Sequence, residues 1–363
     1  MLLDMKMCMM VCSIWFYFHP QTFDGGIIVR VCIPGGNQGP GGPNSFKRNI
    51  IRQLNDVDIH VTTDFAYKDV DVVLLVGGTR NFNWLKRIKK SNIPLVQRLG
   101  PINWLHKYDP ITSKHKWVSL IRNSILFKIR EKYADHVIYQ SQFCLDWWCD
   151  TRGIDAPRSS VILNGVDRNL FEPKIGYSNS NNKLKLISVE GNLSYTEQVY
   201  KTPLELNKML NEKGIDSELT LIGELNHKGI VELNRYDNVH YLGSINHSEM
   251  RDILVRHDVF VSGEINPACP NGPLEAMACG LPVVGFNTGA LSELVLEDSG
   301  ICADYGGNPW ELESPNMGNL LESTNMIKDQ LSYYSNKAVL NIQHNFSLSN
   351  MTDEYVKVFK TLV

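Results

Sequence analysis

The residues best placed to do chemistry follow a short apolar segment, residues 258–262. A loop with Pro270 and Asn271 comes next, and Pro273 stands in the first turn of an expected helix, where its missing N–H is tolerated. Backbone N–H groups at a helix start can bind a phosphate. The carboxylate of Glu275 would repel a phosphate, but it can accept hydrogen bonds from a vicinal diol such as a ribose.

A phosphate site beside a diol site is what a nucleoside diphosphate requires. The segment therefore predicts a nucleotide-binding site made by Asn271, Gly272, Pro273, Leu274 and Glu275. The alternative for Glu275 alone is a carboxylate placed near a helix start because the helix macrodipole favours negative charge there.

The elements that position this segment alternate between short apolar runs and helical patterns along the whole chain. A strand is expected over residues 27–33, followed by a glycine-rich loop at 35–43 and a helix capped by Ser45. The alternation restarts at Leu184. Strands that alternate with helices predict an α/β fold with parallel sheets covered on both faces.

A polar stretch from Tyr177 to Lys183 reads as a linker and divides the chain. We expect an N-terminal domain on the acceptor side over residues 26–178 and a nucleotide-binding domain over 183–346. A last amphipathic helix in 347–363 is expected to return to the first domain. Because ligands bind beyond the carboxyl ends of parallel strands, two such sheets facing each other would form a cleft.

Composition limits the other possibilities. The chain has 363 residues, a net charge of −3 and no basic stripe, so a nucleic-acid partner is not expected. Eight scattered cysteines without a Cys-x-x-Cys pair favour reduced thiols and a cytoplasmic protein. The apolar run at 7–18 is too short to span a bilayer as a helix. We interpret residues 1–25 as an extension rather than a signal or anchor, with peripheral membrane contact left open.

Four segments together resemble the retaining glycosyltransferases of family 4, the glycosyl transferases group 1. The sequence from Pro273 to Val284 (PLEAMACGLPVV) resembles the donor-site motif of that family. Val161 to Asp167 (VILNGVD) looks like the stretch before its second domain, and Asn287 to Glu293 like its glycine-containing turn. Gly41-Gly42 looks like its first-domain glycine loop.

The resemblance implies two Rossmann-like domains facing a cleft, the B-type glycosyltransferase fold. It implies transfer of a sugar from a UDP- or GDP-sugar to a hydroxyl of a glycan, lipid or small-molecule acceptor, with retention and with neither metal nor cofactor. Glu275 would bind the donor ribose. Donor-binding residues would further include the loop and turn residues Gly41, Gly42, Gly191, Asn192, Gly289 and Ala290.

Three departures from the family pattern affect the catalytic residues. The family's first glutamate would fall on Pro267, so we expect Glu264 or Asn266 to take the role facing the sugar. The usual Arg and Lys of the second domain are missing, which leaves Lys201, Arg98 or Arg80 as substitutes. The family's Asp after an Arg-Leu pair is replaced by Gly100.

Arg98 could bind an anionic acceptor or the donor phosphates, or it could be a structural arginine at a strand end. The missing residues also keep two rival functions open. One is a catalytically silent protein that binds nucleotide sugars, and the other is a sugar-nucleotide epimerase of the same fold.

Overall fold

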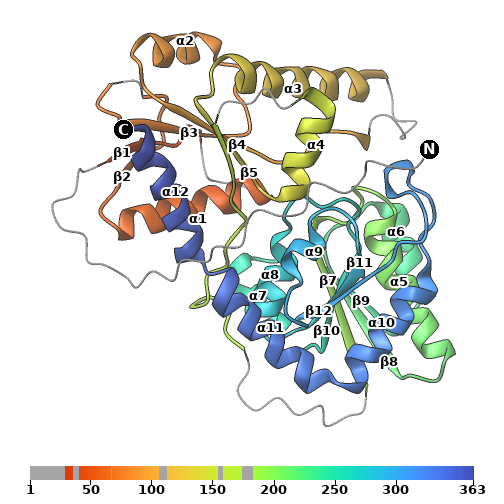
Figure 1. Ribbon diagram of the computed structural model, residues 1–363. Coiled ribbons are helices and arrows are strands. Elements are labelled where there is room, and N and C mark those ends of the chain that lie inside the picture. Colours follow the sequence, from red (N-terminus) through yellow and green to blue (C-terminus); the bar gives the residue numbers. More distant parts are fainter. Residues whose placement is uncertain (1–28, 36–40, 67, 106–112, 154–157, 174–182) are drawn as a thin grey trace, which may run out of the picture.

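The computed structural model contains two α/β domains that lie one above the other in Figure 1. The expected N-terminal extension, residues 1–25, lies outside the described part of the chain. The structure describes residues 29–35, 41–66, 68–105, 113–153, 158–173 and 183–363.

The first domain is built on a six-stranded sheet in the order β2-β1-β3-β4-β5-β6, in which every neighbouring pair is parallel. Its inner strands β3 and β4 are buried on both faces, as expected for a sheet covered by helices on both sides. The elements are β1 (Arg30–Cys32), α1 (Gly42–Asp56), β2 (His60–Thr62), β3 (Val72–Val76), α2 (Phe82–Lys90), β4 (Leu95–Leu99), α3 (Ser113–Lys132), β5 (His136–Tyr139), α4 (Gln142–Arg152) and β6 (Arg158–Val161).

The second domain repeats this plan with the strand order β12-β11-β10-β7-β8-β9, again all parallel. Its elements are β7 (Leu184–Asn192), α5 (Gln198–Glu212), β8 (Ser217–Glu224), α6 (His227–Leu233), β9 (Val239–Gly243), α7 (His247–Leu254), β10 (Val259–Ser262), α8 (Asn271–Ala278), β11 (Val283–Phe286), α9 (Leu291–Leu294), β12 (Gly300–Ala303), the 3₁₀ turn η2 (Pro309–Glu311), α10 (Met317–Asp329) and α11 (Leu331–Asn345).

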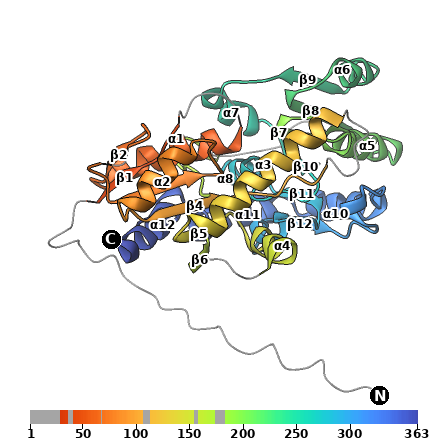
Figure 2. The same cartoon turned by 90° about the horizontal axis from the view of Figure 1, so that it is seen from above.

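The two sheets confirm the prediction of an α/β protein with two Rossmann-like domains. In the view from above, α3 of the first domain lies in front of the second domain (Figure 2). The six described cysteines form no disulfide. Within the described ranges, no helix combines the length and the apolar character needed to cross a membrane.

The start of α1 differs from the sequence prediction. We expected Ser45 to be the cap, but the helix begins three residues earlier, at Gly42, and its N-cap is Gly41. Pro43 lies in the first turn, where its fixed φ suits a helix start. Gly41 has a φ of 103° and a ψ of 152°, a conformation that only glycine adopts without strain.

The last helix, α12 (Leu348–Leu362), packs in the first domain although α11 before it belongs to the second. Its Tyr355 is fully buried and lies 5.4 Å from the ring of Phe46 in α1. The chain therefore crosses between the domains at Ser347, where it forms a β-bridge with Val166 of the other crossing segment.

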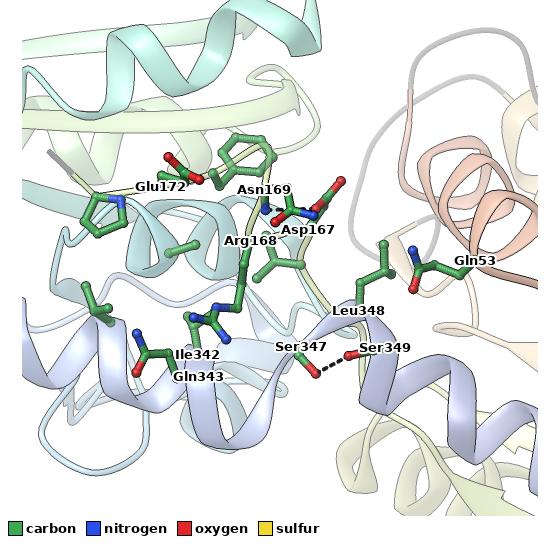
Figure 3. Close-up of a pocket in the computed structure, with 15 residues that line it drawn as sticks. Gln53, Asp167, Arg168, Asn169, Glu172, Ile342, Gln343, Ser347, Leu348 and Ser349 are labelled. Carbon is green, nitrogen blue, oxygen red and sulfur yellow. Dashed lines mark hydrogen bonds between the residues drawn. The ribbon is translucent and has the colours of Figure 1, made fainter. Parts of the chain in front are cut away.

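A cavity of about 430 Å³ lies where these two crossing segments meet (Figure 3). Arg168 and Glu172 line it from one segment, and Ser347 and Ser349 from the other. Both segments connect the domains, so the cavity lies at the connection between them.

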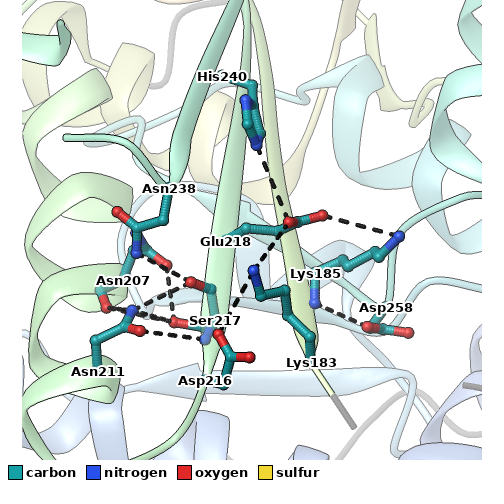
Figure 4. A network of polar contacts seen from close by, with 10 residues as sticks. All are labelled: Lys183, Lys185, Asn207, Asn211, Asp216, Ser217, Glu218, Asn238, His240 and Asp258. Atoms are coloured by element: carbon teal, nitrogen blue, oxygen red, sulfur yellow. Dashed lines mark hydrogen bonds and ion pairs between the residues drawn. The ribbon is translucent and has the colours of Figure 1, made fainter. Parts of the chain in front are cut away.

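A network of polar contacts lies at the amino ends of the strands β7 and β8 in the second sheet (Figure 4). Ser217, at the start of β8, is fully buried and bonds to Asn207 and Asn211 of α5. Lys183 and Glu218 form an ion pair beside it. All these groups lie at the amino ends of the strands, away from the edge where ligands bind, so their role is to hold α5 on the sheet.

Candidate functional site

A cavity of about 660 Å³ lies between the carboxyl ends of the strands of the two domains. The first domain contributes the beginning of α1, and the second contributes the ends of β7 and β8 and the beginnings of α7 and α8. The residues that line it are Gly41, Gly42, Pro43, Ser45, Arg48, Pro101, Gln140, Asn164, Val189, Glu190, Gly191, Ile222, Gly223, Ser244, Ile245, Asn246, His247, Met250, Glu264, Ala268, Cys269, Pro270, Asn271, Gly272 and Glu275.

Three helices begin at this cavity. These are α1 at Gly42, α7 at His247 and α8 at Asn271, and each of these residues lines the cavity. The first N–H groups of a helix have no intrahelical acceptor, and the macrodipole adds a partial positive charge there. The cavity therefore offers three converging sites suited to an anion such as a diphosphate.

Helix α8 is packed closely on its sheet at the cavity. A Cβ on Gly272 would come within 2.9 Å of the carbonyl oxygen of Val189 and 3.0 Å of the ring of Phe260. Asn271 and Gly272 line the cavity, whereas Pro273 and Leu274 are buried behind it. Of the five residues in the predicted segment, Asn271, Gly272 and Glu275 thus line the cavity, and Pro273 and Leu274 are buried behind it.

Glu275 lines the cavity from the second turn of α8, not from the first turn as the sequence suggested. This position removes the macrodipole as the main reason for a carboxylate here. Its Oε1 lies 2.9 Å from Nε2 of His247, and this contact raises the pKa of His247 above its usual range. Sequence reasoning missed His247, since its 28-residue separation from Glu275 carries no motif.

Glu190 and Glu264 also line the cavity, Glu190 near the end of β7 and Glu264 just after the end of β10. Burial raises the pKa of Glu264 to about 7. Burial raises the pKa of Glu190 as well, and the charges of Glu264 and Glu275 raise it further. Glu264 is thus the member of the Glu264–Asn266 alternative that reaches the cavity, and Glu190 was not foreseen from the sequence.

Asn266 is buried and does not line the cavity. Its backbone has a φ of 52° and its N–H donates to Oγ1 of Thr288 over 3.2 Å. It supports the turn that carries Gly289, where a Cβ would meet the backbone of Pro267 at 2.4 Å. The N–H of Ala290 donates to the carbonyl of Pro267 over 2.8 Å, so this amide is used within the loop rather than turned to the cavity.

Arg98 is a structural arginine. It is 2% exposed, and its guanidinium donates to the hydroxyl of Tyr355 at 3.1 Å and to Oδ1 of Asn164 at 2.7 Å. Asn164 in turn donates to Oδ1 of Asn271 over 2.9 Å. The side chain is therefore committed to joining α12 to the start of α8, and the catalytic role considered for it is not supported.

The other basic substitutes do not reach the cavity either. Lys201 forms an ion pair with Glu197, the N-cap residue of α5, and Arg80 is exposed on the first domain. Asn192 lines a neighbouring cavity of about 480 Å³ beside Tyr195 and Gly191. Among the described residues that line the main cavity, the basic side chains are Arg48 and His247.

Comparison with known proteins finds a family match in the second domain. Residues 191–313 match the family model described as Glycosyl transferases group 1. This match lies within the second domain and covers about a third of the chain. The matched range includes Glu264, His247 and Glu275, three of the residues that line the cavity.

A curated relative supports this. The chain is 24% identical over 197 residues to the phosphatidylinositol N-acetylglucosaminyltransferase gpi3 subunit of Schizosaccharomyces pombe, a match that covers 49% of this chain. It covers 39% of the relative, so the chain spans about two fifths of that protein's length.

Solved structures share the whole two-domain arrangement. A sucrose-phosphate synthase from Thermosynechococcus elongatus superposes with a TM-score of 0.69 at 14% identity, over 92% of this chain and 99% of the other. Anabaena HepE in complex with UDP and glucose superposes with a TM-score of 0.65 at 15% identity, over 92% of this chain and 100% of the other. At these identities the likeness shows the fold, and the fold is the B-type glycosyltransferase fold.

Proposed function

We propose that the protein is a glycosyltransferase that moves a sugar from a nucleoside diphosphate to a hydroxyl acceptor with retention of configuration. The observation that carries this proposal is the cavity between the two domains, which is lined both by Glu275 and by the first residues of three helices. A carboxylate suits the ribose diol, and the helix starts suit the diphosphate.

Each group in the cavity then has a task. Glu275 accepts hydrogen bonds from the ribose hydroxyls, and His247 holds its carboxylate in place through the 2.9 Å contact. The first N–H groups of α8, with Arg48 and the start of α1, neutralise the diphosphate. This arrangement uses protein groups alone to stabilise the leaving charge, in keeping with a reaction that needs no metal.

The transfer step balances within the two substrates. The acceptor oxygen forms a bond to the anomeric carbon, and the bond from that carbon to the phosphate oxygen breaks. The acceptor proton passes to the leaving phosphate on the same face of the sugar, so the configuration is kept. The protein contributes position and charge stabilisation, which are large terms in reactions of this type.

Uridine is the first base to test, because HepE of the same fold was solved with UDP and with UDP-glucose. N-acetylglucosamine is a second sugar to test, since the curated relative is named for its transfer. A guanosine donor stays in the proposal, as does a glycan, lipid or small-molecule acceptor.

The proposal is tested by a thermal-shift screen with UDP, GDP and ADP, followed by donor turnover on UDP- and GDP-sugars. A nucleotide that binds the native state raises its apparent stability. We expect one base to give a clear shift and one donor to be consumed with release of the nucleoside diphosphate. Tight binding without turnover on any donor would contradict catalysis and favour a silent binding protein. Conversion of a donor to its epimer would instead favour the epimerase.

A further inference from the structure

Glu190 and Glu264 are brought together by two neighbouring strands. Strands β7 and β10 are hydrogen-bonded and parallel, with Leu186 opposite Val259 and Ile187 opposite Phe260. The same register continued to the strand ends places Glu190 opposite residue 263, one position before Glu264. Glu264 lies beyond the end of β10, where the chain no longer has to follow the alternation of the strand, and both carboxyl groups line the same two cavities.

Both carboxyl groups face the space where a donor would lie. Each lines the main cavity between the domains and the neighbouring cavity next to Gly191 and Tyr195. Oε1 of Glu190 is buried and has no hydrogen-bond partner among the described residues. A buried carboxyl oxygen without a partner is costly, and a bound ligand that hydrogen-bonds to it would remove this cost.

The surroundings of the pair are acidic as well. Glu275 adds negative charge from α8, and the exposed Glu224 does so from the end of β8. The other ionisable groups that line the two cavities are Tyr195, Arg48, His247 and Cys269. Of these, His247 already contacts Glu275. Two charged carboxylates would therefore repel a diphosphate, whereas a pair that holds one proton is both a hydrogen-bond donor and an acceptor.

We infer that Glu190 and Glu264 act as one carboxyl pair that binds hydroxyl groups of the transferred sugar and selects neutral hexosyl donors against donors whose sugar carries a carboxylate. This inference rests on the proposed function and adds Glu190 to it as a specificity-determining residue. A sugar diol donates and accepts hydrogen bonds, as the pair does. A hexuronate would place a further negative charge against the pair.

The pH dependence follows from the same pair. The raised pKa values mean that the pair keeps its proton below about pH 7 and loses it as the pH rises. Affinity for the sugar part of the donor should therefore fall above that pH. Glu190→Gln removes the second charge and keeps a hydrogen-bond donor beside Glu264, as the singly protonated pair does, so the fall should disappear.

The test is calorimetric binding of UDP, UDP-glucose and UDP-glucuronic acid to the full chain and to Glu190→Gln, from pH 5.5 to 8.5. Like-charge juxtaposition is costly, so the native protein should prefer UDP-glucose to UDP-glucuronic acid by about 100-fold or more. In Glu190→Gln we expect this preference to shrink at least about tenfold while the affinity for UDP itself is kept. Glu249→Gln, which removes an exposed carboxylate of α7 outside the cavity, should leave all three affinities unchanged.

Glu264→Gln provides a second variant of the pair, and it should shrink the preference in the same direction. An unchanged preference and an unchanged pH profile in Glu190→Gln would overturn the inference but leave the proposed function intact. Failure of the native protein to bind UDP, GDP or their sugars would overturn both. A structural role for Glu190 would weaken UDP and UDP-glucose equally at every pH, and this result would also overturn the inference.

Discussion

At the residue scale, Glu275 should determine how tightly the nucleotide binds. Glu275→Ala removes a charge-assisted hydrogen bond to the ribose, so nucleotide affinity should fall by about 1.5–3 kcal/mol, measured by calorimetry with UDP or GDP. Glu249→Ala, on the exposed side of α7, is the matched control and should bind the nucleotide normally. Equal affinity of Glu275→Ala and the native protein would contradict the ribose role.

The contact between His247 and Glu275 makes stability depend on pH in a defined direction. The carboxylate raises the pKa of His247 in the folded protein above its unfolded value of about 6.5. The contribution of the pair is therefore complete below about pH 6.5 and is lost as the pH rises through the higher folded pKa.

We therefore expect His247→Gln to lower the free energy of unfolding most at acidic pH and least at alkaline pH, as followed by urea denaturation from pH 5.5 to 8.5. A double-mutant cycle isolates the pair. When His247→Gln is made in the Glu275→Gln variant, its effect on the free energy of unfolding should no longer depend on pH. A difference that grows with pH would show that His247 is held neutral and that the assignment is wrong.

The sequence predicted part of the site for a physical reason. Asn271 to Glu275 are contiguous, and a helix start carries its own signals in Pro270 and Pro273. Glu190 and His247 have no such signals, because strand order and helix packing bring them to Glu275 from 85 and 28 residues away. For Arg98 the sequence left two roles open, binding of an anion and a structural role. Its burial and its hydrogen bond to Tyr355 support the structural role.

At the element scale, the start of α1 is set by the backbone conformation of Gly41, whereas the sequence predicted Ser45 as the N-cap. Ser45 is a common capping type, but the helix begins earlier because Gly41 can take a φ of 103° and Pro43 then fits the first turn. The N-terminus of α1 thereby reaches the cavity. Capping preference alone could not show this, since a glycine cap leaves no side-chain signal.

Two adjacent glycines give a matched test of this start. A Cβ on Gly41 or on Gly42 would meet no atom within 4 Å, so any cost of alanine is backbone strain and not crowding. Gly41→Ala should destabilise the protein by about 1–3 kcal/mol because of its positive φ. Gly42→Ala, within the helix, should be neutral or stabilising by up to about 1 kcal/mol. Urea midpoints measure both, and equal midpoints would disprove the strain.

At the scale of the whole molecule, the alternation of strands and helices was enough to predict two Rossmann-like domains, because each domain is assembled from neighbouring segments. The contact between the domains was not predictable in this way. It joins Trp310 of η2 to Trp104, Phe143 and Trp147 of the first domain, at ring-centroid distances of 5.2, 5.8 and 4.7 Å.

A second contact lies beside the aromatic one. The carboxylate of Glu293 in α9 accepts hydrogen bonds from the backbone N–H groups of Gln142 and Phe143, both over 2.7 Å. These N–H groups form the start of α4, where a negative charge is favoured by the macrodipole and by charge-assisted hydrogen bonding. Trp310 and Glu293 together hold the domains in the arrangement that forms the cavity.

Loss of the aromatic contact made by Trp310 should open the cleft between the domains. Each aromatic pair contributes about 0.5–1.5 kcal/mol beyond its buried area, so Trp310→Ala should shift the population toward a more open form. We expect a larger radius of gyration by small-angle X-ray scattering, and a lower kcat/KM because less of the protein has the two walls of the cavity together. Adding nucleotide should reverse part of the expansion, since the ligand binds the closed form.

Trp117→Ala is the matched control, because Trp117 is 66% exposed on α3 and makes no part of the domain contact. It should leave the radius and the activity unchanged. Glu293→Gln keeps the shape of the side chain but removes its charge, so it should expand the protein less than Trp310→Ala does. A radius of gyration of Trp310→Ala equal to that of the native protein, with and without nucleotide, would show that the aromatic contact does not set the domain arrangement. The crossing segments at Val166 and Ser347 would then be enough to set it.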